Sequence, residues 1–124
     1  MSADEITLHL PRERPFFSVA HLVVGGLAVR LDLSFEQLED LQVALGELLE
    51  QHETEQEITV SVRVEGDTIH ALVGPFDGSL EQELGRDSGE SVGLRRVLET
   101  VVDNVQITHR DGAPWVELTK AMTP

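Results

Sequence analysis

The chain has 124 residues and a formal net charge of −14, from 23 Asp and Glu against 9 Lys and Arg. So acidic a surface repels phosphate backbones, and we therefore expect no direct nucleic-acid partner. The chain contains no cysteine, which excludes disulfides and thiolate chemistry and fits a reducing cytoplasm, where we expect the protein to act.

The chain opens with a predicted strand and a long predicted helix. Alternating apolar and polar residues over 5–10 indicate a half-buried strand, which two prolines end. Apolar residues at helical spacing over about 15–31 predict a buried core helix. Its apolar run is well short of the ~20 residues that a membrane span needs, so we expect no membrane association. Gly25 and Gly26 weaken this helix by roughly 1 kcal/mol each relative to alanine, and such glycines often mark a close approach of a backbone or a partner.

A second helix is predicted to begin at Ser34, which forms a capping box with Gln37. Leucines at helical spacing give it one apolar face, and we expect it to end near residues 51–54. The remaining predicted elements are strands at 57–65 and 68–73, a loop over 74–89, a helix at 91–103, and strands at 105–110 and 115–120.

This order of elements predicts the fold class. Helices that lie between antiparallel hairpins favour an α+β two-layer sandwich, with a mostly antiparallel sheet and about three helices on one face. The length suits one domain, so we expect a single domain over residues 1–124 with its core at about 5–120. Because 40% of the residues are apolar, the chain can bury such a core.

Four segments, at residues 34–51, 66–69, 91–98 and 102–105, carry a family resemblance through their order and spacing. They resemble the second helix, the hairpin before the adenine loop, the phosphate-loop helix and the following strand of the anti-sigma-factor serine kinases of bacteria. That family is the small single-domain branch of the Bergerat-fold ATPases, which include histidine kinases and gyrase B. The similarity extends over residues 6–120 and implies the same two-layer fold.

The resemblance implies roles for two residues of the second helix. In the family, a glutamate there acts as general base through water, and an asparagine one turn later holds magnesium. Glu47 matches the glutamate as the catalytic candidate. Gln51 takes the asparagine's place as the nucleotide-binding and metal candidate, with a side chain longer by one methylene. The alternative, a solvated polar stripe on an amphipathic helix, is the interpretation that we favour.

The resemblance also implies two nucleotide-binding loops. The family has an aspartate followed by glycines at alternating positions, and the nearest match here is Asp77 with the adjacent Gly78; a plain turn fits this stretch better. In the phosphate loop, Ser91 stands where the family has a glycine, and Gly93 and Leu94 match the family. Free N–H groups at a helix start can hold an anion. The acidic residues of this loop oppose a triphosphate, so the sequence disfavours an efficient ATP site.

The sequence therefore predicts a regulatory protein-binding module resembling an anti-sigma factor, with ATP binding weakened or lost. Such a module would sequester a sigma factor or an anti-anti-sigma antagonist and would form a homodimer. Since family dimers form around the N-terminal strand and first helix, we expect an interface at Phe16, Phe17, Gly25 and Gly26; the alternative, burial in the core, explains most of the apolar pattern of this helix. We expect no cofactor. The alternatives are an active serine kinase that uses ATP and magnesium, and the same fold serving outside transcription.

Overall fold

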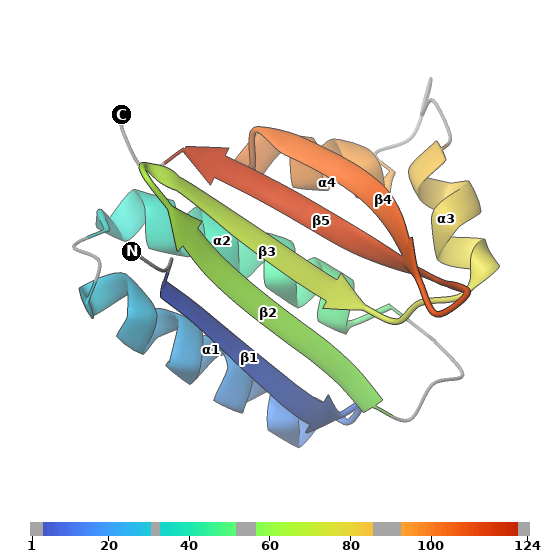
Figure 1. The fold of residues 1–124 in the computed structure, drawn as a ribbon, viewed down its shortest axis with the longest axis horizontal. Coiled ribbons are helices and arrows are strands. Elements are labelled where there is room, and N and C mark those ends of the chain that lie inside the picture. Colours follow the sequence, from blue (N-terminus) through green and yellow to red (C-terminus); the bar gives the residue numbers. More distant parts are fainter. Residues whose placement is uncertain (1–3, 31–32, 52–56, 86–92, 122–124) are drawn as a thin grey trace.

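A computed structural model describes residues 4–30, 33–51, 57–85 and 93–121, which form five strands and four helices (Figure 1). In chain order these elements are β1 (Asp4–Pro11), α1 (Arg14–Arg30), α2 (Phe35–Leu49), β2 (Glu57–Glu65), β3 (Thr68–Gly74), α3 (Gly78–Gly85), α4 (Leu94–Val101), β4 (Asn104–Arg110) and β5 (Ala113–Ala121).

The strands form one sheet in the order β1-β2-β3-β5-β4, and every neighbouring pair is antiparallel. Tight turns join β2 to β3 and β4 to β5. Gly66 has a φ of 62°, and Asp111 and Gly112 have φ of 52° and 79°. These left-handed conformations suit glycine and aspartate and are typical of short hairpin turns. Strands β1 and β2 pair with each other although the two long helices α1 and α2 lie between them in the chain.

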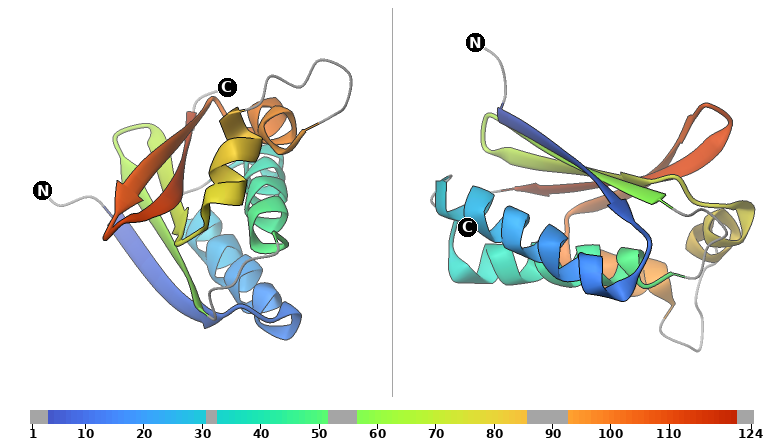
Figure 2. Two further views of the ribbon diagram at one scale, coloured as in Figure 1. Left: turned by 90° about the vertical axis from the view of Figure 1, so that its right-hand side faces the viewer. Right: turned by 90° about the horizontal axis from the view of Figure 1, so that it is seen from below.

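The helices form a single layer on one face of this sheet. Figure 2 shows α1, α2 and α4 beneath the strands, with α3 at one end of the layer. The central helix of the layer is α2, because it contacts α1 on one side and α4 on the other. The predicted α+β two-layer sandwich with an antiparallel sheet is therefore confirmed.

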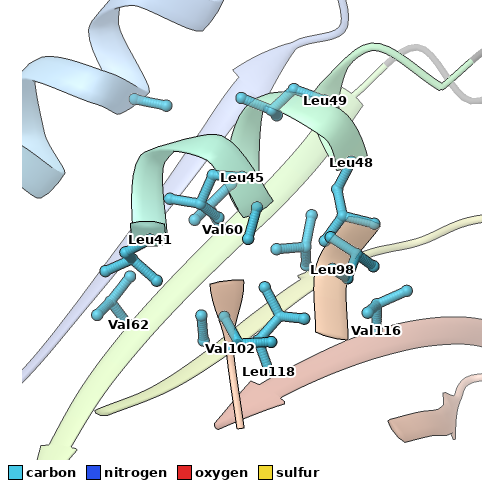
Figure 3. Packing of buried hydrophobic residues seen from close by; sticks show 14 of the residues in the cluster. Leu41, Leu45, Leu48, Leu49, Val60, Val62, Leu98, Val102, Val116 and Leu118 are labelled. Carbon is cyan, nitrogen blue, oxygen red and sulfur yellow. The ribbon is translucent and has the colours of Figure 1, made fainter. Parts of the chain in front are cut away.

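The core lies between α2 and the sheet. Along β2 the even-numbered residues from Ile58 to Val64 are buried and alternate with half-buried or exposed ones. Leu45 and Leu48 of α2 are fully buried, and Figure 3 shows them in one cluster with Val60 of β2. Removing such a side chain from water contributes about 1.5–3 kcal/mol, so this layer contact supplies much of the stability of the fold.

The predicted start of α2 is confirmed in detail. The Ser34 hydroxyl oxygen accepts a hydrogen bond from the Gln37 N–H at 3.1 Å, and the Gln37 side-chain oxygen accepts one from the Ser34 N–H at 3.1 Å. Two N–H groups that the helix itself cannot satisfy are thereby paired.

The predicted loop over 74–89 is wrong in part, because residues 78–85 form α3 and the described helices number four rather than three. Leu80 and Leu84 lie one turn apart and are both buried. Glycines at both ends of so short a segment resemble turn residues, and this hides the helix in the sequence. The third predicted helix is shorter than expected, since α4 begins at Leu94 and ends at Val101.

No helix in the described ranges is both long enough and apolar enough to cross a membrane.

We expect Leu45→Ala to lower the free energy of unfolding by about 2–5 kcal/mol, because it removes a fully buried side chain and leaves a cavity. Urea denaturation monitored by circular dichroism measures the loss. The matched control is Val43→Ala, which truncates an apolar side chain of the same helix that is 44% exposed. An equal loss in the two variants would contradict the packing described here.

Candidate functional site

The topology gathers the sequence-predicted nucleotide residues at one end of the helical layer. The C-terminus of α2, the start of α3 and the N-terminus of α4 lie toward the same end of the sheet in Figures 1 and 2, and α4 contacts both α2 and α3. Glu47, Asp77 and Gly93 belong to these three places. Ser91 lies outside the described residues.

Glu47 and Gln51 stand at the C-terminal end of α2. The Glu47 side chain is exposed to solvent. The Gln51 amide nitrogen donates a 2.8 Å hydrogen bond to the backbone carbonyl oxygen of Glu47. This carbonyl belongs to the last turn, where the helix leaves its acceptors unpaired. Gln51 thus closes the end of the helix in this structure, and its amide group is engaged with the backbone.

Asp77 also serves its local backbone. One of its carboxylate oxygens accepts hydrogen bonds from the Ser79 N–H at 2.9 Å and from the Ser79 hydroxyl at 2.5 Å. Because Asp77 directly precedes α3, these are the contacts of a helix N-cap residue. Gly78, the first residue of α3, is exposed, and nothing lies within 4 Å of the position that a Cβ would take there. No close approach therefore requires glycine at this position.

At the start of α4, no side chain caps the backbone N–H groups, and the first helical side chain is buried. Gly93 occupies the N-cap position in an extended conformation and makes no side-chain cap bond. The next residue, Leu94, is only 6% exposed and belongs to the hydrophobic core. The match of this pair to the family's phosphate loop is therefore compatible with a packing role for Leu94.

Apolar side chains fill the space between the sheet and α3. Phe76 is 2% exposed and packs in the core with Leu80 and Leu84. Its backbone N–H donates to the Pro114 carbonyl oxygen at 2.8 Å, which fastens the segment after β3 to the start of β5.

Arg12 holds the same segment from outside the core. Its guanidinium lies 5.3 Å from the centre of the Phe76 ring and donates a 2.8 Å hydrogen bond to the Pro75 carbonyl oxygen. Neither Phe76 nor Arg12 is predicted as a site residue from the sequence. The only sequence signal was a buried-type aromatic residue inside a turn-rich stretch.

The predicted interface residues of α1 divide between two faces of the helix. Phe17 packs against the core, and a Cβ on Gly25 would lie 3.8 Å from the Gln42 amide nitrogen of α2. Phe16 and Gly26 are exposed, together with three further apolar residues. These residues, Phe16, Val19, Leu22, Gly26 and Val29, form the outer stripe of α1. Their spacing places them on one helical face.

One acidic residue of α2 is part of the structural framework. Lys120 of β5 is largely buried, and its ammonium lies 3.3 Å from the Asp40 carboxylate and 2.9 Å from the Val101 carbonyl oxygen. This single lysine thereby joins the sheet to both α2 and α4. The exposed acids Glu36, Glu39 and Glu47 are left as the solvent-facing charges of the helix.

Within the described ranges, no group of three or more His, Asp or Glu side chains is arranged to hold a metal ion.

The sequence is similar to proteins of one bacterial kinase family. A serine-protein kinase RsbW from Listeria monocytogenes serovar 1/2a is 30% identical over 133 residues, which cover 91% of this chain and 85% of the relative. The chain belongs to the RsbW family of serine-protein kinases. A serine-protein kinase RsbW from Bacillus anthracis strain A0248 is 24% identical over 131 residues, covering 88% of this chain and 80% of the relative. No protein-family model matches the chain.

The fold agrees with this assignment. The crystal structure of the RsbU and RsbW domains of a Mycobacterium tuberculosis protein superposes with a TM-score of 0.71 at 16% identity. The match covers 96% of this chain but 32% of that one, so the shared part is about a third of the larger protein. The family resemblance seen in the sequence is thus confirmed as an RsbW-like domain of the Bergerat fold.

We expect Asp77→Ala to lower the free energy of unfolding by about 1 kcal/mol, because the first turn of α3 loses its cap. Asp77→Asn keeps an acceptor oxygen and is expected to stay within a few tenths of a kcal/mol of the unchanged protein. Urea denaturation without nucleotide compares the two variants. Equal losses in both would show that the negative charge, rather than the cap, is what α3 needs.

Proposed function

We propose that this RsbW-family chain is a regulatory protein-binding module that sequesters a sigma factor or an anti-anti-sigma antagonist, with ATP binding weakened or lost. It acts as a single domain in the bacterial cytoplasm and pairs with a second copy of itself. The observation that carries the proposal is the outer stripe of α1.

The outer stripe exposes large apolar side chains to water, which does not stabilise an isolated domain. Leu22 is 75% exposed and Val29 is 82% exposed, with Phe16 and Val19 on the same face at about 40%. Contiguous apolar surface of this kind marks protein–protein contact sites. Gly26 leaves the middle of the stripe low, because nothing lies within 4 Å of its Cβ position. A partner helix can therefore approach closely at this point.

The positions that a nucleotide would use support the weakened ATP site. The Gln51 amide nitrogen binds backbone, the Asp77 carboxylate caps α3, and the Leu94 side chain is buried. None of these three roles depends on a ligand. The exposed Glu47 in the last turn of α2 adds negative charge at the end where triphosphate and magnesium would sit. The acidic surface of the chain as a whole speeds the approach of a basic protein partner.

The second candidate function is an active serine kinase. One observation favours it: the Glu47 carboxylate is exposed and has no ion-pair or hydrogen-bond partner among the described residues. A carboxylate in this state is available as a general base. The kinase would need ATP and magnesium, with Gln51 turning its amide oxygen toward the metal.

We expect millimolar ATP with magnesium to leave the melting temperature unchanged. A ligand present at a hundred times its dissociation constant would stabilise the fold by about 2.7 kcal/mol, so differential scanning fluorimetry is sensitive enough to decide. The control is ATP with the Glu47→Gln variant. A clear stabilisation, together with phosphoserine on a purified antagonist that is lost in Glu47→Gln, would establish the kinase instead.

We expect the double variant Leu22→Ser, Val29→Ser to bind a purified sigma factor or antagonist at least tenfold more weakly, because two anchors of the stripe are lost. Isothermal titration measures the affinity at low and high salt, and the unchanged protein should bind less tightly at high salt. The control is Val43→Ser, an exposed apolar residue of α2. Undiminished binding by the double variant would place the partner elsewhere.

A further inference from the structure

The face of the sheet that carries no helices is hollowed. A depression of about 520 Å³ lies over β1, β2, β3 and β5, next to the turn between β4 and β5. This volume falls in the range of small-molecule sites. Because the outer stripe of α1 and the nucleotide end both belong to the helical layer, a site here is separate from the proposed partner surface.

Two basic side chains in the depression each have a buried nitrogen that lacks a hydrogen-bond partner among the described residues. Arg63 of β2 and His70 of β3 are directly opposite each other in the register. The Arg63 Nε and the His70 Nδ1 are buried, and neither has a hydrogen-bond partner in the described part of the chain. A buried polar group without a partner is costly, and a native structure usually explains each one by a bound water, ion or ligand.

The neighbouring polar groups of this face differ, because they satisfy one another. The Thr7 and Ser61 hydroxyls are 3.3 Å apart, and the His9 Nδ1 lies 2.8 Å from the Thr59 hydroxyl. Among the buried polar atoms of these lining residues, the two that lack a hydrogen-bond partner in the described part of the chain belong to Arg63 and His70, and Glu5 stands opposite Arg63 on β1. An anionic oxygen acceptor placed there would pair with the guanidinium through charge-assisted hydrogen bonds.

Two apolar side chains continue the depression from this pair along β3, with Glu117 opposite Leu72 in the register and the Arg110 guanidinium 5.6 Å from the centre of the Trp115 ring. Leu72, two residues beyond His70, lines the depression, and the Trp115 ring follows it. The ring occupies the space beside Gly74 that a side chain would fill, since a Cβ there would be 2.5 Å from the Trp115 Cδ2. Only glycine allows this placement. From His70 to Gly74 the strand spans about 13 Å, which matches an apolar body several carbon atoms long.

The charge of the rim limits what the ligand can be. Glu5, Asp111 and Glu117 also line the depression, against the two guanidinium groups of Arg63 and Arg110. Three carboxylates repel a polyanion such as a nucleoside triphosphate, whereas one carboxylate can pair with Arg63. We propose that this depression binds a small amphipathic monocarboxylate, with its charged end at Arg63 and His70 and its apolar body over Leu72 and Trp115.

Trp115 is the only tryptophan of the chain, so its fluorescence reports directly on this site. The probe is 4-phenylbutyrate, and its uncharged amide, 4-phenylbutyramide, keeps the apolar body and removes the charge. We expect a saturable change in Trp115 fluorescence with the acid and binding weaker by about tenfold with the amide, as a charge-assisted hydrogen bond requires. Inorganic phosphate, which lacks the apolar body, is expected to cause no saturable change.

A pair of arginine variants completes the test. Arg63→Gln is expected to weaken the binding of 4-phenylbutyrate by about tenfold and to leave the binding of the amide unchanged. The control is Arg96→Gln, which removes the same charge from an exposed residue of α4 in the helical layer and should bind like the unchanged protein. The proposal is overturned if the acid shows no saturable binding, if acid and amide bind equally, or if phosphate competes with the acid. The comparison of acid and amide uses the unchanged protein, so it decides even if Arg63→Gln fails to fold.

Discussion

The structure depends on one constraint: all the helices lie on the same face of a single antiparallel sheet. Because successive side chains of a strand point to opposite faces, each strand must supply its fully buried apolar residues to the face that the helices cover. The alternation along β2 places its buried residues on that face, and the fully buried Leu45 and Leu48 of α2 pack against them. The other elements are placed by this contact, since α1 and α4 flank α2 and α3 packs on α4.

The same constraint separates the molecule into regions with different chemistry. At the end of the helical layer, where the RsbW family would hold a nucleotide, the candidate residues are engaged in contacts within the fold. Gln51 closes α2, Asp77 caps α3, and Phe76 fills the core beside it. A side chain that already bonds a helix end or packs in the core is less available to contact a ligand. This is the physical basis for proposing a binding module rather than a kinase.

The two surfaces proposed for binding lie on opposite sides of the sheet. The outer stripe of α1 is apolar and suits a protein partner. In the depression over the strands, one buried nitrogen each of Arg63 and His70 lacks a hydrogen-bond partner among the described residues, next to Leu72 and Trp115. Gly74 contributes to the second surface through its missing side chain, because the Trp115 ring occupies that space. Alternate residues of one strand face the depression on one side of the sheet and the core beneath the helices on the other.

The sequence by itself determined the elements that have strong local signals. Period-two alternation marks β2, helical spacing and a capping box mark α2, and the order of elements together with the family resemblance identifies the two-layer fold. Helix α3 escaped because eight residues bounded by Gly78 and Gly85 look like a turn, and only the burial of Leu80 and Leu84 stabilises it. Sequence spacing also could not tell that Gly26 faces outward while Gly25 faces α2.

Contacts between distant residues were decided only by the tertiary structure. Lys120 meets Asp40 across eighty positions, Arg12 reaches the carbonyl of Pro75, and Trp115 lies on Gly74. None of these pairs has a spacing that a pattern of period 2 or 3.6 can reveal, because such patterns report only which face of its own element a residue occupies. Which residues of other elements share that face is set when the sheet pairs and the helices pack on it.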